Sequence, residues 1–92
     1  METETNVARF EPGAIIVTQG VSAAMTQSEI LDSLIRHLAG DWVDDVRRRT
    51  NEKALADGER ILSSFVSSGG TPFWVITEAD RSATTFLLPK EY

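Results

Sequence analysis

The sequence contains no cysteine and a single histidine, His37. Without cysteine the chain can form neither a disulfide nor a thiolate metal site. It has no apolar run near the ~20 residues that a membrane helix needs. Residues 1–6 are acidic and polar, which is unlike a signal peptide. These absences predict a cytoplasmic protein with no membrane partner.

The chain also lacks an excess of positive charge. Fourteen acidic residues stand against nine basic ones, for a net charge of −5. Nucleic-acid binding draws its affinity from many Lys and Arg side chains that face phosphates, so we expect no direct nucleic-acid partner. A protein partner with a basic surface fits this charge, because complementary charges steer association. The simpler alternative is that the charge only keeps a small protein in solution.

No catalytic motif is present. The sequence contains no P-loop, no Gly-x-Gly-x-x-Gly run and no Gly-x-Ser-x-Gly elbow. His37 lies near the end of a predicted helix, where a cationic ring would favour the carbonyl dipole, and we interpret it as structural. We therefore predict no enzyme activity, no catalytic residue, no metal and no cofactor.

What the chain does contain is three β-prone runs between residues 60 and 88. Residues 60–67, 73–78 and 82–88 are rich in Ile, Val, Phe, Trp and Thr and are separated by short polar breaks. This pattern predicts an antiparallel meander. The run 13–18 is a candidate fourth strand at an edge of the sheet. The register of the last hairpin stays open, because its turn contains no glycine.

The clearest helix covers residues 27–39. Thr26 and Glu29 have the spacing of a capping box, and Gly40 follows the last periodic residue as a left-handed cap would. Apolar residues recur at three- and four-residue steps and form one stripe. We expect this helix to pack on the sheet through Leu31, Leu34, Ile35 and Leu38.

A second helical region covers residues 41–57. Thr50 or Asn51 could cap a new helix, so we expect two short helices with a break near residue 50. The predicted fold is α+β, with a three- or four-stranded antiparallel sheet and two or three helices on one face. Ninety-two residues predict a single domain, 1–92, with residues 1–12 as a flexible start.

Two charged clusters are candidate sites. Asp41, Asp44 and Asp45, with Glu52 nearby, could supply oxygens to a hard cation, but they lack the spacing of a calcium loop. We interpret them as helix caps and first-turn carboxylates. The basic run 47–49 has acids on both sides at ion-pair spacing, which predicts an internally neutralised helix face.

The predicted sheet has apolar residues on both faces, whereas one layer of helices covers only one face. The remaining apolar face is a partner site or a dimer seam unless the N-terminal segment folds over it. Our candidate partner-binding residues combine the acids and the aromatic side chains with the charged turn after residue 77: Asp41, Trp42, Asp44, Asp45, Trp74, Glu78, Asp80 and Arg81.

From residue 36 onward the sequence resembles a family of short bacterial proteins found on plasmids, phages and other mobile elements. The motifs that carry the resemblance are Arg36-His37, Gly40-Asp41-Trp42, Asn51 with Ala54-Leu55, the run 58–63, the run 74–85 and the ending 87–92. Val43 departs from the pattern, which has glycine there. No activity or catalytic residue is assigned to this family.

The resemblance implies a role by context. Small acidic proteins of mobile elements are similar in role to inhibitors of host defence, such as anti-CRISPR or anti-restriction proteins. We therefore hypothesise a non-enzymatic inhibitor that acts on a basic, nucleic-acid-binding protein surface. The alternative is a self-associating accessory module, a homodimer, that uses the exposed face of its sheet.

Overall fold

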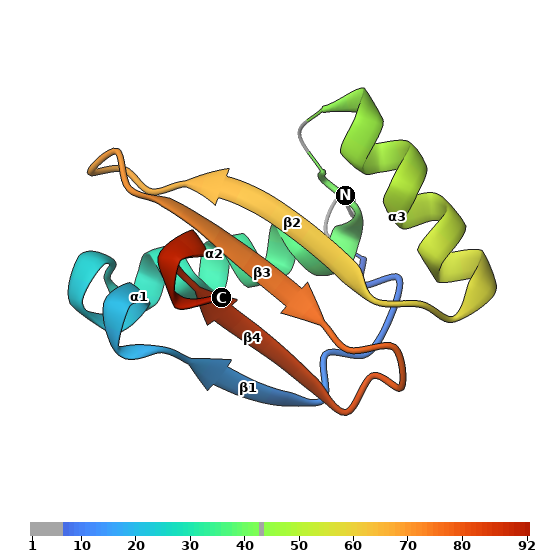
Figure 1. The fold of residues 1–92 in the computed structure, drawn as a ribbon, viewed down its shortest axis with the longest axis horizontal. Coiled ribbons are helices and arrows are strands. Elements are labelled where there is room, and N and C mark those ends of the chain that lie inside the picture. Colours follow the sequence, from blue (N-terminus) through green and yellow to red (C-terminus); the bar gives the residue numbers. More distant parts are fainter. Residues whose placement is uncertain (1–6, 43) are drawn as a thin grey trace, which may run out of the picture.

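The computed structural model describes residues 7–42 and 44–92. This part of the chain forms an α+β fold with a four-stranded mixed sheet (Figure 1). The elements follow in the order β1 (Ala14–Val17), α1 (Gln19–Ala24), α2 (Gln27–Ala39), α3 (Asp45–Asp57), β2 (Ile61–Val66), β3 (Pro72–Thr77), β4 (Ala83–Leu87) and the 3-10 helix η1 (Pro89–Glu91).

The sheet has the strand order β1-β4-β3-β2. Strands β2, β3 and β4 form the predicted antiparallel meander, with Ser63 opposite Val75 and Val75 opposite Phe86. The prediction of a purely antiparallel sheet is wrong, because β1 joins β4 in parallel, with Ile15 opposite Thr84. The chain between β1 and β4 passes through three helices and two strands, so no tight turn forces the two strands to run in opposite directions.

Local signals place the ends of α2 correctly. The Thr26 hydroxyl accepts from the Glu29 amide, and the Glu29 carboxylate accepts from the Thr26 amide, each at 3.1 Å. Gly40 ends the helix with φ of 85°, a left-handed conformation that glycine adopts without steric cost. The predicted helix 27–39 is confirmed.

Helix α3 differs from the prediction. It is continuous from Asp45 to Asp57, so the expected break near residue 50 is wrong. The helix begins at Asp45, because the Asp44 carboxylate accepts from the Arg47 amide at 2.7 Å and caps it. Asn51 does not cap a new helix, because its side chain points to β2 and binds the backbone there.

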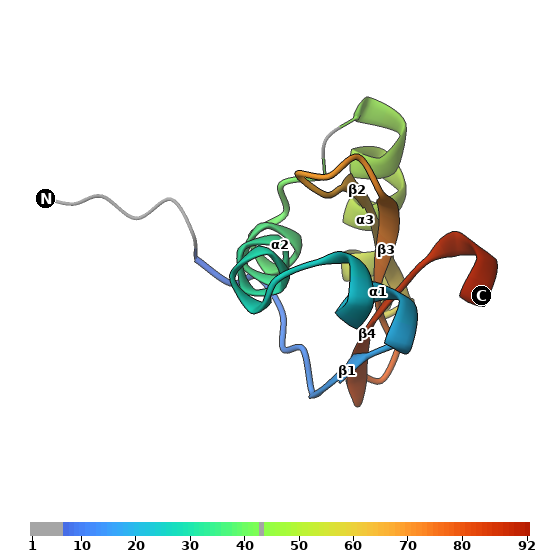
Figure 2. The same cartoon turned by 90° about the vertical axis from the view of Figure 1, so that its left-hand side faces the viewer.

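Helix α2 covers one face of the sheet, as Figure 2 shows. Its fully packed residues are the polar Ser33 and His37, while Ile30 and Leu34 pack at the margin of the core. The expectation that Leu31 packs on the sheet is wrong, since 56% of it is exposed. It lies beside β1, where a four-residue edge strand offers too little surface to cover it. The main core consists of Val21, Met25, Phe65, Phe73, Val75 and Phe86.

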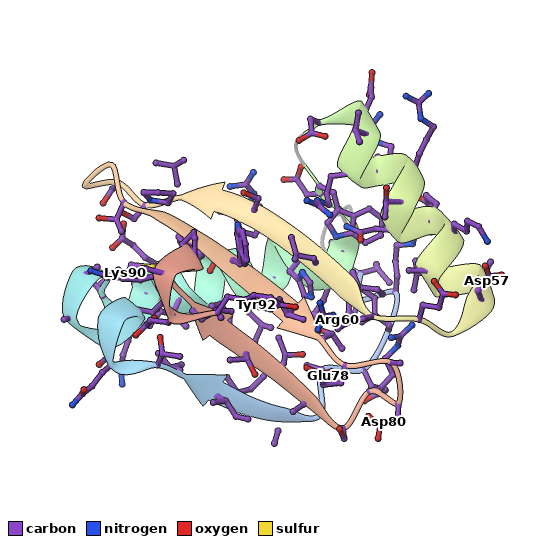
Figure 3. All side chains as sticks on the ribbon, viewed as in Figure 1. Asp57, Arg60, Glu78, Asp80, Lys90 and Tyr92 are labelled. Atoms are coloured by element: carbon purple, nitrogen blue, oxygen red, sulfur yellow. The ribbon has the colours of Figure 1, made fainter. Side chains whose placement is uncertain are left out.

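The other face of the sheet is partly covered by the C-terminal segment. The Tyr92 ring packs edge-on against Trp74, with centroids 5.5 Å apart, and the Tyr92 hydroxyl accepts from Arg60 at 2.7 Å (Figure 3). Ile76 and Leu87, on this face, are buried. The alternative that the N-terminal segment covers this face is not supported by its described residues: residues 9–13 lie on the helix side, where the Arg9 amide donates to the Leu38 carbonyl at 2.8 Å.

Candidate functional site

The predicted acidic cluster lies at the connection between α2 and α3, and its carboxylates are bound within the molecule. Asp44 is the cap of α3, and Asp45 pairs with Arg48 at 2.8 Å. Asp41 pairs with Arg36 at 2.8 Å. In the described part of the chain, no group of three or more His, Asp or Glu side chains is placed to hold a metal ion. Each of these three carboxylates uses one oxygen within the molecule, so the cluster serves first as a helix cap and as surface ion pairs.

Trp42 is the candidate that the structure removes from the surface. Only 2% of it is exposed, and it forms a second core with Ala54 and Ile61. The guanidinium of Arg9 lies over its ring, 5.5 Å from the centroid. A buried indole offers no contact area to a partner, so the prediction that Trp42 binds one is not supported by its position.

Of the remaining candidates, Trp74 lies in β3 opposite Leu87 and packs against Tyr92, whereas Glu78, Asp80 and Arg81 lie at the β3–β4 connection. Asp80 accepts from the Ser82 amide at 3.0 Å, and hydrogen bonding by Ser82 holds the pKa of Asp80 below its ordinary value. Arg81 has φ of 60° and donates to the carbonyls of Glu59 and Glu78 at 2.8 and 3.1 Å. Asp80 and Arg81 therefore shape the turn. Figures 1 and 2 both place this turn far from the α2–α3 connection, so the two predicted groups form no single site.

Sequence reasoning missed a buried chain of side-chain hydrogen bonds around His37. Ser63 Oγ lies 2.5 Å from Nδ1 of His37, and Nε2 lies 2.9 Å from Thr77 Oγ1. Thr77 Oγ1 is 2.6 Å from Thr84 Oγ1, which donates to the Pro12 carbonyl at 2.8 Å. These four side chains are all buried, and the chain joins α2, three strands and the N-terminal segment.

The Pro12 carbonyl sets the direction of every bond in this chain. A carbonyl can only accept, so Thr84 donates to it and accepts from Thr77. Thr77 in turn accepts from His37 Nε2–H, which leaves Nδ1 to accept from Ser63. Burial lowers the pKa of His37 to about 3, so the ring is neutral. The favourable interaction of a cationic ring with the helix dipole therefore does not arise, because the ring is enclosed by the sheet and by Phe10.

Ser63 and His37 have the spacing of a nucleophile and its base, but their surroundings do not support catalysis. Both are fully buried, and the Phe10 ring packs edge-on against the imidazole with centroids 5.3 Å apart. The second imidazole nitrogen binds a hydroxyl rather than an orienting carboxylate. The arrangement holds α2 against the sheet without exposing a nucleophile.

The surface feature that stands apart is apolar and lies between β1 and α2. Ile15, Ile16, Val17 and Leu31 are 45%, 47%, 37% and 56% exposed. A groove of about 490 Å³ runs between the two elements, lined by Ile15, Val17, Ser22, Gln27, Ile30, Leu31 and Leu34. Ile15, Val17 and Leu31 lie on the groove side, whereas Ile16 points to the other face of the sheet at the same edge. We call these four residues, with this groove, the β1–α2 surface. A sequence signal exists for it, because residues 12–28 contain no charged residue.

The two edges of the sheet differ in how they end. At the β2 edge, Asn51 Nδ2 donates to the Leu62 carbonyl at 2.8 Å, and the Leu62 amide donates to Asn51 Oδ1 at 3.2 Å. One side chain thus replaces a neighbouring strand at that position, beneath α3. At the β1 edge, Figures 1 and 2 show no element of the described chain beyond the strand. An open strand edge is a template for pairing with another chain.

Comparisons with known protein families, curated proteins and solved structures find no match to this chain. None of the helices in the described residues combines the length and apolarity that a membrane crossing needs.

Proposed function

We propose that the protein is a non-enzymatic binding protein that contacts another polypeptide through its β1–α2 surface. The observation that carries this proposal is the exposure of Ile15, Val17 and Leu31 beside a groove, together with Ile16 on the other side of the same open strand edge. Scattered apolar residues are normal on a surface, whereas a contiguous group indicates an interaction site.

The surface offers two kinds of contact. The edge of β1 provides backbone donors and acceptors for an added strand, a mode of recognition in which the main chain gives affinity and side-chain pockets give specificity. The groove beside Leu31 and Leu34 provides a pocket for an apolar side chain. Both contacts are uncharged, so we expect binding through this surface to persist at high salt.

Photo-crosslinking tests whether the surface is used. A benzoylphenylalanine introduced at position 31 should give a covalent adduct in the native cells, because Leu31 borders the groove. The matched control is position 46, where Val46 is 69% exposed on the far helix α3. Adducts at position 31 and none at 46 support the proposal. Adducts at neither position, or equally at both, contradict it.

A second candidate function is the charge-driven inhibitor of a basic, nucleic-acid-binding surface, such as that of a defence complex. The observation in its favour is that the half-buried Glu78 and the exposed Asp80 lie near each other at the β3–β4 connection (Figure 3), whereas the carboxylate of Asp57, on α3, is paired with Lys53. The neighbouring Glu59 is exposed as well. Such a group attracts Lys and Arg by the same electrostatics that attract phosphates to them.

Salt and charge reversal separate this candidate from the first. If the protein is such an inhibitor, the amount of partner that it captures from native lysate should fall steeply between low and physiological salt. The double variant Glu59→Lys/Glu78→Lys should lose it, while Asp32→Lys, an exposed acid on α2, should retain it. Capture that is insensitive to salt and to both variants argues against a charge-driven inhibitor.

A further inference from the structure

We propose that the β1–α2 surface binds a second copy of this chain, with β1 paired to the partner's β1 in an antiparallel register across a two-fold axis. This inference rests on the proposed function, since it names the occupant of the same surface. The dimer expected from the sequence would use the face of the sheet opposite α2. We place the contact at the β1 edge instead, because Tyr92 and η1 partly cover that face.

The backbone of β1 limits the registers that are possible. The amides of Ala14 and Thr18 donate to Ser82 and Phe86 of β4 at 2.9 and 3.0 Å. Successive residues of a strand alternate in direction, so the N–H and C=O groups of Ile15 and Val17 point away from the sheet. Only one antiparallel self-pairing in this short strand joins these two residues to each other: Ile15 to the second copy's Val17, and the reverse. Ile16 then lies opposite its own counterpart on the axis.

The side chains fit this register on both faces. Ile15 and Val17 share the helix side with Thr84 and Phe86, because paired residues of a parallel ladder point the same way. Pairing Ile15 with Val17 across the axis therefore places apolar residues together under the two grooves. On the other face, Ile16 meets Ile16. A two-fold contact requires a patch that complements itself, and this one does.

Charge also favours a second copy at this place. Two molecules of charge −5 repel each other, so they meet most readily where neither carries charge. All fourteen acidic and nine basic residues lie outside residues 12–28, the segment that contains β1 and α1. Strand β1 has no Lys or Pro of the kind that protects an edge strand, whereas the β2 edge is bound at Leu62 by Asn51.

The size of the patch predicts a reversible dimer. The four exposed side chains offer an apolar area on the order of 300 Å² per copy, at the lower end for functional surface patches. Stable interfaces bury about 800 Å² per partner. We therefore expect a monomer–dimer equilibrium that shifts with protein concentration and does not weaken as salt is raised.

Single-cysteine variants test both the dimer and its register, because the chain has no cysteine of its own. In a non-hydrogen-bonded antiparallel pair the two Cα atoms are about 4.5 Å apart, within the range that a disulfide spans. Under mild oxidation Ile16→Cys should form a covalent dimer of twice the 10.1 kDa chain mass. Val66→Cys, at an exposed position (67%) on the opposite edge strand, should crosslink at least about tenfold more slowly.

Sedimentation equilibrium gives the second readout. The wild type should approach twice the monomer mass as concentration rises, and Ile16→Asp should stay monomeric because it places two carboxylates across the axis. Val66→Asp should dimerise like the wild type, and thermal melts should show both variants folded. A wild type that remains monomeric, or equal crosslinking rates for Ile16→Cys and Val66→Cys, overturns the dimer. If adducts from position 31 to a different protein persist in that case, the proposed function stands without it.

Discussion

The neutral His37 makes a quantitative prediction about stability and pH. The pKa of His37 is lowered by burial to about 3 in the folded protein, whereas an unfolded chain has a histidine pKa near 6.5. Above pH 6.5 both states are neutral and the histidine has no effect. As the pH falls below 6.5, the unfolded state binds a proton that the folded state cannot, so stability is lost progressively down to about pH 3.

The magnitude follows from the two pKa values. Each pH unit within this window costs about 1.4 kcal/mol, so the free energy of unfolding should fall by about 2 kcal/mol between pH 7 and pH 5. For a domain of this size, that corresponds to a melting temperature lower by roughly 8–16 °C. Carboxylates such as Glu52, whose pKa is lowered by hydrogen bonding from Arg9, titrate mainly below this range.

The assay is urea unfolding at pH 7, 6 and 5, followed by circular dichroism, for the wild type and for His37→Gln. The chain has no other histidine, so the variant removes the only side chain whose ordinary pKa lies in this window. The variant should be less stable at pH 7, because it disturbs the bonds to Ser63 and Thr77, but its stability should hardly change between pH 7 and 5. A wild type equally stable at pH 7 and 5, or a variant with the same dependence, refutes the reasoning.

Two further predictions concern packing. Asn51→Ala removes both hydrogen bonds to the backbone of Leu62 and leaves the strand edge unpaired beneath α3. The variant should lower the free energy of unfolding in urea by about 2–3 kcal/mol. A loss below about 0.5 kcal/mol would show that water replaces the amide without cost. Leu34→Ala should lower the free energy of unfolding by about 1–3 kcal/mol, since Leu34 packs at the core margin. Leu31→Ala should lower it by under about 0.5 kcal/mol at concentrations where the protein is monomeric, since Leu31 is exposed. The reverse order in thermal melts would contradict this packing.

The local elements of this fold could be predicted from sequence because their causes are local. Thr26, Glu29 and Gly40 define the two ends of α2 through bonds within a few residues. The apolar runs after residue 60 produce β2, β3 and β4 with boundaries within two residues of those expected. In each case the deciding interactions lie within one element or across one short turn.

The errors arise where a distant partner decides the outcome. Asn51 has the chemistry of a helix cap, but the backbone of Leu62 takes its side chain and α3 continues through it. Trp42 is of a residue type that often contacts partners at protein interfaces, yet α3 and β2 enclose it. The interpretation of His37 as structural agrees with its burial, but its neutral state depends on Ser63, Thr77 and Phe10, which are far away in the sequence.

The sequence by itself determined the α+β class, the three-stranded meander, the helix 27–39 and the absence of charge from residues 12–28. The edge position of the strand within 13–18 was also expected from the sequence. The tertiary structure alone decided that β1 pairs with β4 in parallel, and that Ile15, Ile16 and Val17 remain exposed there. The physical reason is that a short apolar strand has the same pattern whichever strand it joins and in whichever direction. Its neighbours, which are remote in the chain, determine which of its groups remain open to a partner.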